Sequence, residues 1–229
     1  MTPSEQYGNI RAAVNPETRP LSTVFGVLVT AFARLVTGVR GQWQGCLPED
    51  RPRIYFANHC SHGDFVLIWT VLPAALRRRT RPVAAADYWG RGRLRRAIAG
   101  GVFRAVLVDR DAATRDSDPL AAMLAALDDG ASLIFFPEGT RNTTVAALLP
   151  FKSGLWRLAR ARPDIELVPV WIENLNRVLP KGEFVPVPLL CTVTFGAPLR
   201  LFDDEGNAPF RERSRAALLA VRPNREPAS

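Results

Sequence analysis

The stretch RIYFANHCSHGDFVLIWTVLPAAL, from Arg53 to Leu76, contains the signals that decide the fold class. Its beginning, 53–58, follows Pro52 and has the apolar and aromatic composition of a short strand. Its end, 64–76, is an apolar run long enough for a buried helix, with Asp64 at or near the N-cap. The polar residues between them therefore occupy a turn that joins a strand to a helix.

The same alternation continues along the chain. Helix 117–130 is the clearest, because Asp118 can cap it, Pro119 suits its first position and Gly130 suits its end. Further strands are expected at 83–88, 100–110, 132–136, 165–172 and 189–199, and further helices through Ile98 and at 152–161 and 211–222. Strands alternating with helices predict an α/β fold with a mixed, largely parallel central sheet flanked by helices.

The length and composition fit one domain with an N-terminal appendage. The chain has 229 residues, of which 47% are hydrophobic and 23% charged, which is enough to form an ordinary core. Residues 1–20 are polar, contain three prolines and lack the basic start of a signal peptide, so we expect a flexible N-terminus. The α/β domain is expected over 41–229.

Residues 21–40 between them are expected to form an amphipathic helix. Apolar side chains recur there at steps of three and four residues, which places them on one helical face: Leu21, Val24, Phe25, Leu28, Phe32, Leu35, Val36 and Val39. Arg34 interrupts the run, which suits a helix lying at a membrane surface better than one crossing it. A helix packed on the protein's own core fits the pattern equally well.

Positive charge is concentrated in one stretch. The chain has a net charge of +8, and residues 77–110, with ten arginines against two acids, carry an excess of the same size. This favours an anionic partner, which is a phosphorylated ligand, an anionic membrane surface or a nucleic acid. The cysteines are Cys46, Cys60 and Cys191, whose wide spacing favours neither disulfides nor a zinc site and suggests a reducing compartment.

Both histidines of the chain, His59 and His62, lie in the turn before the helix. His59 and Asp64 are five residues apart, so one helix face cannot present both, but Asp64 at a helix start can reach back to the His59 ring. Such a carboxylate fixes the imidazole tautomer and makes His59 a plausible general base. Neither Ser61 nor Cys60 sits in a nucleophile elbow, so the base is expected to act directly on a substrate hydroxyl. No second ligand cluster completes a metal site.

Polar residues follow three of the predicted strands, at 58–64, 109–110 and 137–142. Ligands of open α/β sheets bind at the carboxyl ends of the strands, so these three segments are expected to meet in space.

The motifs resemble those of the glycerolipid acyltransferases, the lysophosphatidic acid acyltransferase family. NHCSHGD (58–64) fits the N-H-x-x-x-x-D motif and FPEGTR (136–141) matches the third block of the family letter for letter. GVFRAVLVDR (101–110), FKSG (151–154) and VPV (168–170) resemble the other blocks, in family order.

This resemblance implies a role for each matching residue. His59 would take the proton of the acceptor hydroxyl and Asp64 would orient His59. Glu138 would contact the acceptor glycerol or brace the site, while backbone N–H groups at Gly139 and Thr140 would stabilise the oxyanion. Arg141 and Arg104 would hold the acceptor phosphate, and Lys152 would add to that charge. Arg110 would serve the same end or pair with Asp109, and Asn58 and Pro137 would have structural roles in the motifs.

The resemblance also implies the substrates. The acyl donor would be acyl-CoA or acyl-acyl carrier protein as co-substrate, with no other cofactor and no metal. The acceptor would be 1-acyl-glycerol 3-phosphate, giving phosphatidic acid, with glycerol 3-phosphate or a lyso-ornithine lipid as alternatives. The enzyme would lie at an anionic membrane on the cytoplasmic face of the inner membrane, as a peripheral or monotopic protein, and no nucleic-acid partner is expected. A non-catalytic anionic-lipid-binding protein is the alternative from another class.

Overall fold

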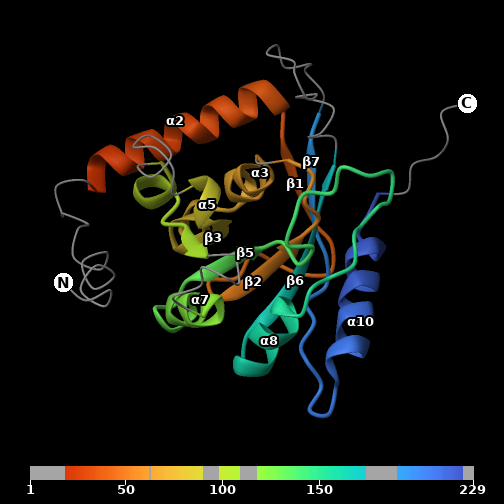
Figure 1. Ribbon diagram of the computed structural model, residues 1–229. Helices are drawn as coiled ribbons and strands as arrows, with labels where there is room; N and C mark the ends of the chain where they lie inside the picture. The colour runs from red at the N-terminus through yellow and green to blue at the C-terminus, as the bar shows by residue number, and fades with distance from the viewer. Residues whose placement is uncertain (1–18, 62, 90–97, 109–117, 174–189, 224–229) are drawn as a thin grey trace, which may run out of the picture.

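The computed structural model describes residues 19–61, 63–89, 98–108, 118–173 and 190–223. Within these residues one sheet crosses the molecule in the order β1-β7-β6-β2-β5-β3-β4 (Figure 1). Its strands are β1 (Arg40–Trp43), β2 (Arg53–Ala57), β3 (Thr80–Ala85), β4 (Val106–Val108), β5 (Ser132–Phe135), β6 (Glu166–Glu173) and β7 (Thr192–Phe195). Neighbouring strands are parallel except β6 and β7, which confirms the predicted mixed, largely parallel sheet.

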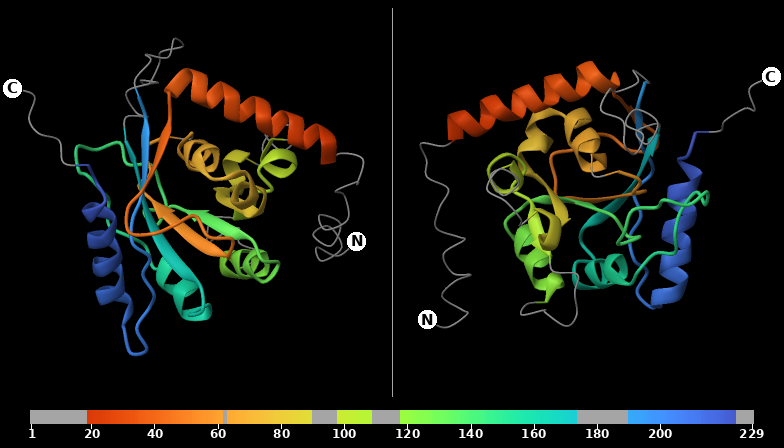
Figure 2. Two further views of the ribbon diagram at one scale, coloured as in Figure 1. Left: turned by 180° about the vertical axis from the view of Figure 1, so that it is seen from behind. Right: turned by 45° about the horizontal axis from the view of Figure 1, so that its top comes forward.

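Helices cover both faces of the sheet, as Figures 1 and 2 show. One layer contains α2 (Arg19–Thr37), α3 (Asp64–Val71), α4 (Ala74–Arg79), α5 (Ala86–Trp89) and the π-helical turn η3 (Ile98–Val102), and the other contains α7 (Pro119–Asp128), α8 (Gly154–Ala161) and α10 (Asn207–Ala220). The central strand β2 is buried throughout and contributes to two hydrophobic cores, with Tyr55 and Ala57 in the first and Ile54 and Phe56 in the second. This alternation follows from the two-residue period of a strand.

Several elements differ from the sequence prediction. The strand expected over 83–88 is β3 at Thr80–Ala85, followed by the short helix α5 at Ala86–Trp89. The helix expected over 64–76 is two helices, α3 and α4, because Pro73 between them cannot continue a helix. The strand expected over 100–110 is shorter: η3 occupies its start, and β4 begins only at Val106. The strand β1 was not predicted, since its four residues are mostly exposed and show no apolar alternation.

The helix α2 packs on the domain through small residues. Gly26, Thr30, Ala33 and Thr37 are buried, and a Cβ atom on Gly26 would come within 3.3 Å of the Trp69 ring. Arg77 links the helix to the domain: its guanidinium donates to the Thr30 hydroxyl at 3.0 Å and to the Leu72 carbonyl at 3.0 Å.

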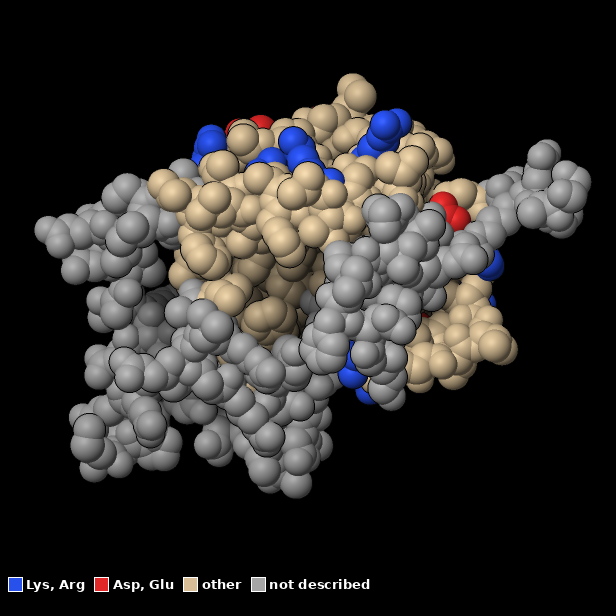
Figure 3. Space-filling model, turned by 90° about the horizontal axis from the view of Figure 1, so that it is seen from above, with Lys and Arg blue, Asp and Glu red and all other residues tan. Residues whose placement is uncertain are grey.

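The predicted apolar face of α2 is largely exposed to solvent. Phe32 and Leu35 are 67% and 84% exposed, and Val24, Phe25 and Leu28 are also exposed, whereas Val36 and Val39 pack against the first core. Figure 3 shows that uncharged residues make up most of the described surface on this side of the molecule. No helix among the described residues combines the length and the apolarity that crossing a membrane requires.

Candidate active site

The turn after β2 holds an imidazole and a carboxylate in direct contact. His59 Nδ1 lies 2.9 Å from Asp64 Oδ2. The same oxygen accepts the backbone N–H groups of Cys60 at 2.6 Å and Ser61 at 2.8 Å, so the turn itself orients the carboxylate. With Nδ1–H donating to Asp64, the lone pair of His59 lies on Nε2, which is the arrangement that a general base requires.

The backbone of His59 is held on both sides by the 136–142 segment. Its N–H donates to Glu138 Oε1 at 2.9 Å, and its carbonyl accepts the Asn142 N–H at 2.6 Å. This segment follows β5, which pairs with β2 in parallel, so the carboxyl ends of both strands bring it beside the turn. Two of the three predicted polar segments therefore meet, and the third, 109–110, lies outside the described residues.

Glu138 is buried, with 1% of its surface exposed, and its carboxylate accepts two backbone N–H groups. Besides His59 it accepts the Leu149 N–H at 2.7 Å, so it joins the His59 turn to the loop before α8. Burial raises the pKa of Glu138, which the two backbone hydrogen bonds partly oppose. Of the two roles expected for Glu138, this geometry matches the bracing one.

Further contacts fix the position of His59. Asn58 exchanges two hydrogen bonds with the backbone of Ile172, at 2.8 and 3.0 Å, which ties the end of β2 to β6. The rings of His59 and Phe136 stack with centroids 4.2 Å apart. Neither Phe136 nor Asn142 was among the expected site residues; the only signal for Phe136 is its place at the end of a buried strand.

The FPEGTR turn also positions cationic side chains. Gly139 has φ of 68°, and a Cβ atom there would lie only 2.8 Å from Lys152 Cδ, so glycine gives the Lys152 side chain room to lie across the turn. The Lys152 N–H donates to the Pro137 carbonyl at 2.8 Å, and Arg141 precedes Asn142 in the chain with an exposed side chain. Arg141 and Lys152 are therefore part of, or hydrogen-bonded to, the FPEGTR segment that holds the His59 turn.

One proposed oxyanion donor is already engaged. The Gly139 N–H donates to the Phe136 carbonyl at 3.0 Å within the turn, so it is not available to a substrate in this conformation. The expectation for the Gly139 N–H is corrected accordingly, which leaves the Thr140 N–H as the candidate from that pair.

Cys60 does not have the properties of a nucleophile. Burial, together with the nearby charges of Asp64 and Glu138, raises the pKa of the Cys60 thiol to about 11. The thiol therefore stays protonated at neutral pH, whereas the thiolate is the reactive form.

Arg104 does not lie with His59, which corrects its expected place in the acceptor pocket. It precedes β4, which runs parallel to β3, so it lies at the amino ends of the strands, whereas His59 follows the carboxyl end of β2. There it shares a pocket with Arg78, Arg79 and Arg81. The expectation failed because the strand begins at Val106 and not at Gly100. Arg78, Arg79 and Arg81 end α4 or begin β3, so this part of the basic stretch 77–110 also lies away from the His59 turn. Arg110 and His62 lie outside the described residues.

The sequence model of the Acyltransferase family matches residues 40–173, which include β1 to β6, the His59 turn and the FPEGTR segment. This match covers more than half of the 229 residues. The chain belongs to the Acyltransferase family.

Individual relatives within this family are distant. A 1-acyl-sn-glycerol-3-phosphate acyltransferase from Limnanthes douglasii is 25% identical over 194 residues, covering 80% of this chain and 63% of the relative. One from Haemophilus influenzae is 26% identical over 164 residues, covering 66% of this chain and 65% of the relative. The chain thus spans less than two thirds of the length of these relatives.

A solved structure supports the fold. The crystal structure of the 1-acyl-sn-glycerophosphate (LPA) acyltransferase PlsC from Thermotoga maritima superposes with a TM-score of 0.67 at 20% sequence identity. The alignment covers 94% of this acyltransferase-family chain and 87% of the other. The arrangement of sheet and helices is therefore shared well beyond the residues that match the family.

Proposed function

We propose that this protein transfers a fatty acyl group from an acyl thioester to the free hydroxyl of a lysophospholipid. The observation that carries the proposal is the contact between His59 and Asp64, in a turn whose backbone is held by Glu138 of the FPEGTR segment. The relatives named 1-acyl-sn-glycerol-3-phosphate acyltransferase support 1-acyl-glycerol 3-phosphate as the acceptor and phosphatidic acid as the product.

In the proposed reaction, His59 Nε2 takes the proton of the acceptor hydroxyl while Asp64 stabilises the imidazolium through Nδ1. The hydroxyl oxygen attacks the thioester carbonyl carbon, and the resulting oxyanion needs a donor such as the Thr140 N–H. The C–S bond then breaks, and the leaving thiolate receives the proton from His59. The raised pKa of Cys60 supports direct transfer without an acyl-cysteine intermediate.

The substrate assignments follow from charge and exposure. Arg141 and Lys152, both exposed beside the His59 turn, would hold the acceptor phosphate, because cations are suited to phosphate oxygens. The donor would be acyl-CoA or acyl-acyl carrier protein, acting as co-substrate with no other cofactor. Glycerol 3-phosphate and lyso-ornithine lipid are the alternative acceptors.

The test of this proposal is acyl transfer by the purified protein to a panel of these acceptors, with His59→Ala as the matched variant. We expect phosphatidic acid from 1-acyl-glycerol 3-phosphate, and loss of about 10²–10⁴-fold in rate in His59→Ala. Product from another acceptor alone would change the named substrate. Unchanged activity in His59→Ala would contradict the mechanism, and absence of transfer to every acceptor by a protein that binds anionic vesicles would favour the lipid-binding alternative.

The exposed apolar face of α2 supports docking on a membrane surface, which we place at the cytoplasmic face of the inner membrane as a peripheral or monotopic association. Phe32→Asp with Leu35→Asp should weaken binding to anionic vesicles by about 10²–10⁴-fold, because each lost side chain removes about 1.5–3 kcal/mol of free energy from apolar burial. The control is Leu47→Asp with Val145→Asp, which adds the same charge at exposed apolar side chains outside α2. Equal vesicle sedimentation of both variants would contradict docking through α2.

A further inference from the structure

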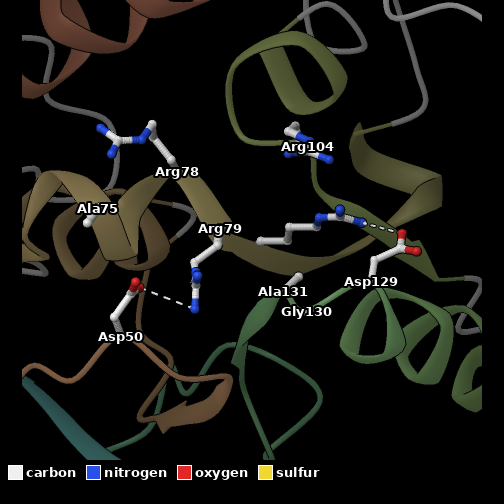
Figure 4. Close-up of a pocket in the computed structure, with 9 residues that line it drawn as sticks. Asp50, Ala75, Arg78, Arg79, Arg104, Asp129, Gly130 and Ala131 are labelled. Atoms are coloured by element: carbon white, nitrogen blue, oxygen red, sulfur yellow. Dashed lines mark ion pairs between the residues drawn. The ribbon is translucent and has the colours of Figure 1, made fainter.

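A second charged site lies where the parallel strands begin, which we call the amino edge of the sheet. It is away from the His59 turn, which lies at the carboxyl edge, where the strands end. A cavity of about 310 Å³ opens there between the end of α4, the start of β3, the segment before β4 and the end of α7. Four arginines and two aspartates line it, as the close-up in Figure 4 shows: Arg78, Arg79, Arg81 and Arg104, with Asp50 and Asp129.

This cavity is separate from the proposed active site. Strand register aligns Arg81 with Leu133 and Leu133 with Ile54, so the basic residues lie level with the start of β2. The other end of β2 is Ala57, three residues beyond Ile54, which is about 10 Å along the strand at about 3.3 Å per residue. His59 lies two residues further along the chain, in the turn at that end, and the lateral separation of the strands adds to the distance. One small ligand cannot occupy both places.

The carboxylates do not neutralise the arginines. Arg79 pairs with Asp50 at 3.2 Å and Arg81 with Asp129 at 3.6 Å, and both aspartates are largely exposed, at 66% and 60%. Exposed pairs of this kind are weak. Arg78 and Arg104 pair with no carboxylate within the part of the chain that the structure describes. The cavity therefore carries an excess of two positive charges.

The positions of Arg81 and Arg104 are unfavourable in free energy for both residues. Arg81 is 16% exposed and its buried Nε has no partner among the described residues. Burial lowers the pKa of Arg81, and the positive charge of Arg104 lowers it further. Arg104 is the one non-glycine residue among those described with positive φ, at 50°, a conformation that persists only where the surroundings impose it. In Figure 4, Arg104 lies on the Asp129 side of the pocket and Arg79 points to Asp50.

We propose that this cavity is an anion site for a phosphate group, bound mainly between the guanidinium groups of Arg81 and Arg104, with Arg79 on the opposite side. An anion there converts the repulsion between two like charges into attraction, and guanidinium forks bond phosphate oxygens in pairs. Asp129 competes with the phosphate for Arg81. The phosphate belongs either to a soluble molecule or to a lipid headgroup, and both supply the same chemistry.

The experiment measures binding of inorganic phosphate by calorimetry and retention on vesicles containing phosphatidic acid, at fixed ionic strength. All proteins carry Arg141→Ala and Lys152→Ala, so that the proposed acceptor pocket does not contribute. Arg104→Ala should weaken binding by at least about 10-fold, since charge-assisted hydrogen bonds are lost. Asp129→Asn should tighten it several-fold, because the competing carboxylate is removed. Arg157→Ala, which breaks an exposed pair with Asp118 on another part of the surface, is the charge-matched control and should change nothing.

The two variants shift binding in opposite directions, so a general loss of folding cannot imitate the expected pattern. If Arg104→Ala weakens and Asp129→Asn tightens binding of inorganic phosphate, the ligand is a soluble molecule. If these changes are seen only with vesicles, the ligand is a lipid headgroup, and either result supports the site. Equal phosphate affinity and equal vesicle retention in the parent protein, Arg104→Ala, Asp129→Asn and Arg157→Ala would overturn the proposal. Since acyl transfer is not the readout, this result is independent of the proposed function.

Discussion

At the carboxyl edge of the sheet, the carboxylates of Asp64 and Glu138 are buried and each accepts two backbone N–H groups. At the amino edge, Asp50 and Asp129 are exposed and face arginine side chains. The first pair of carboxylates is held by backbone donors that the fold fixes, whereas the second pair is exposed and leaves an excess of arginine charge unneutralised. The comparison teaches that the first edge is built to hold one geometry, as a catalytic group requires, and the second to attract an anion.

The largest expected effect comes from removing the charge that orients His59. Asp64→Asn keeps the size of the side chain but cannot stabilise the imidazolium, so kcat for acyl transfer should fall by about 10²–10⁴-fold with a small change in KM. Steady-state kinetics measure kcat and KM, and melting curves check that the variant is folded. Cys60→Ala is the neighbouring control and should retain activity, because its thiol is protonated. A variant Asp64→Asn with normal kcat would remove the functional contrast between the edges.

A smaller effect is expected at Glu138, which braces the same turn. In Glu138→Gln one of the two backbone N–H groups would face an amide NH₂ group, so the free energy of unfolding should fall by about 1–3 kcal/mol. The measurement is urea unfolding, together with kcat.

The pH dependence of that experiment has a defined sign. Because burial raises the pKa of Glu138, the native state holds this proton more tightly than the unfolded chain. The stabilisation from Glu138 is therefore full below the ordinary glutamate pKa and is lost as the pH rises through the raised pKa. The stability of the parent protein should fall relative to Glu138→Gln across this window. The exposed Glu212→Gln is the control, and parallel stability profiles would contradict the buried role.

The smallest effect on catalysis is expected at the amino edge. Arg104→Ala, assayed in detergent with saturating substrates, should change kcat by less than about twofold, since Arg104 lies far from the His59 turn. Arg141→Ala should instead raise KM for the acceptor. A tenfold loss of kcat in Arg104→Ala would show that the two edges are not functionally separate.

The sequence by itself determined the features that depend on local spacing. The alternation of strands and helices predicted the α/β class, and the separation of five positions from His59 to Asp64 was enough to predict their contact through a turn. The caps at Asp118 and Pro119 located α7, because a cap acts within one helical turn.

Only the tertiary structure decided which edge each charged residue occupies. Arg104 lies within the motif GVFRAVLVDR (101–110), yet it is at the amino edge because β4 begins at Val106, after η3. The bracing role of Glu138 likewise depends on distant partners, because its carboxylate accepts the backbone N–H groups of His59 and Leu149. The physical reason is that side-chain spacing is a local property, whereas the edge at which a residue emerges depends on where its strand starts and how it pairs across the sheet.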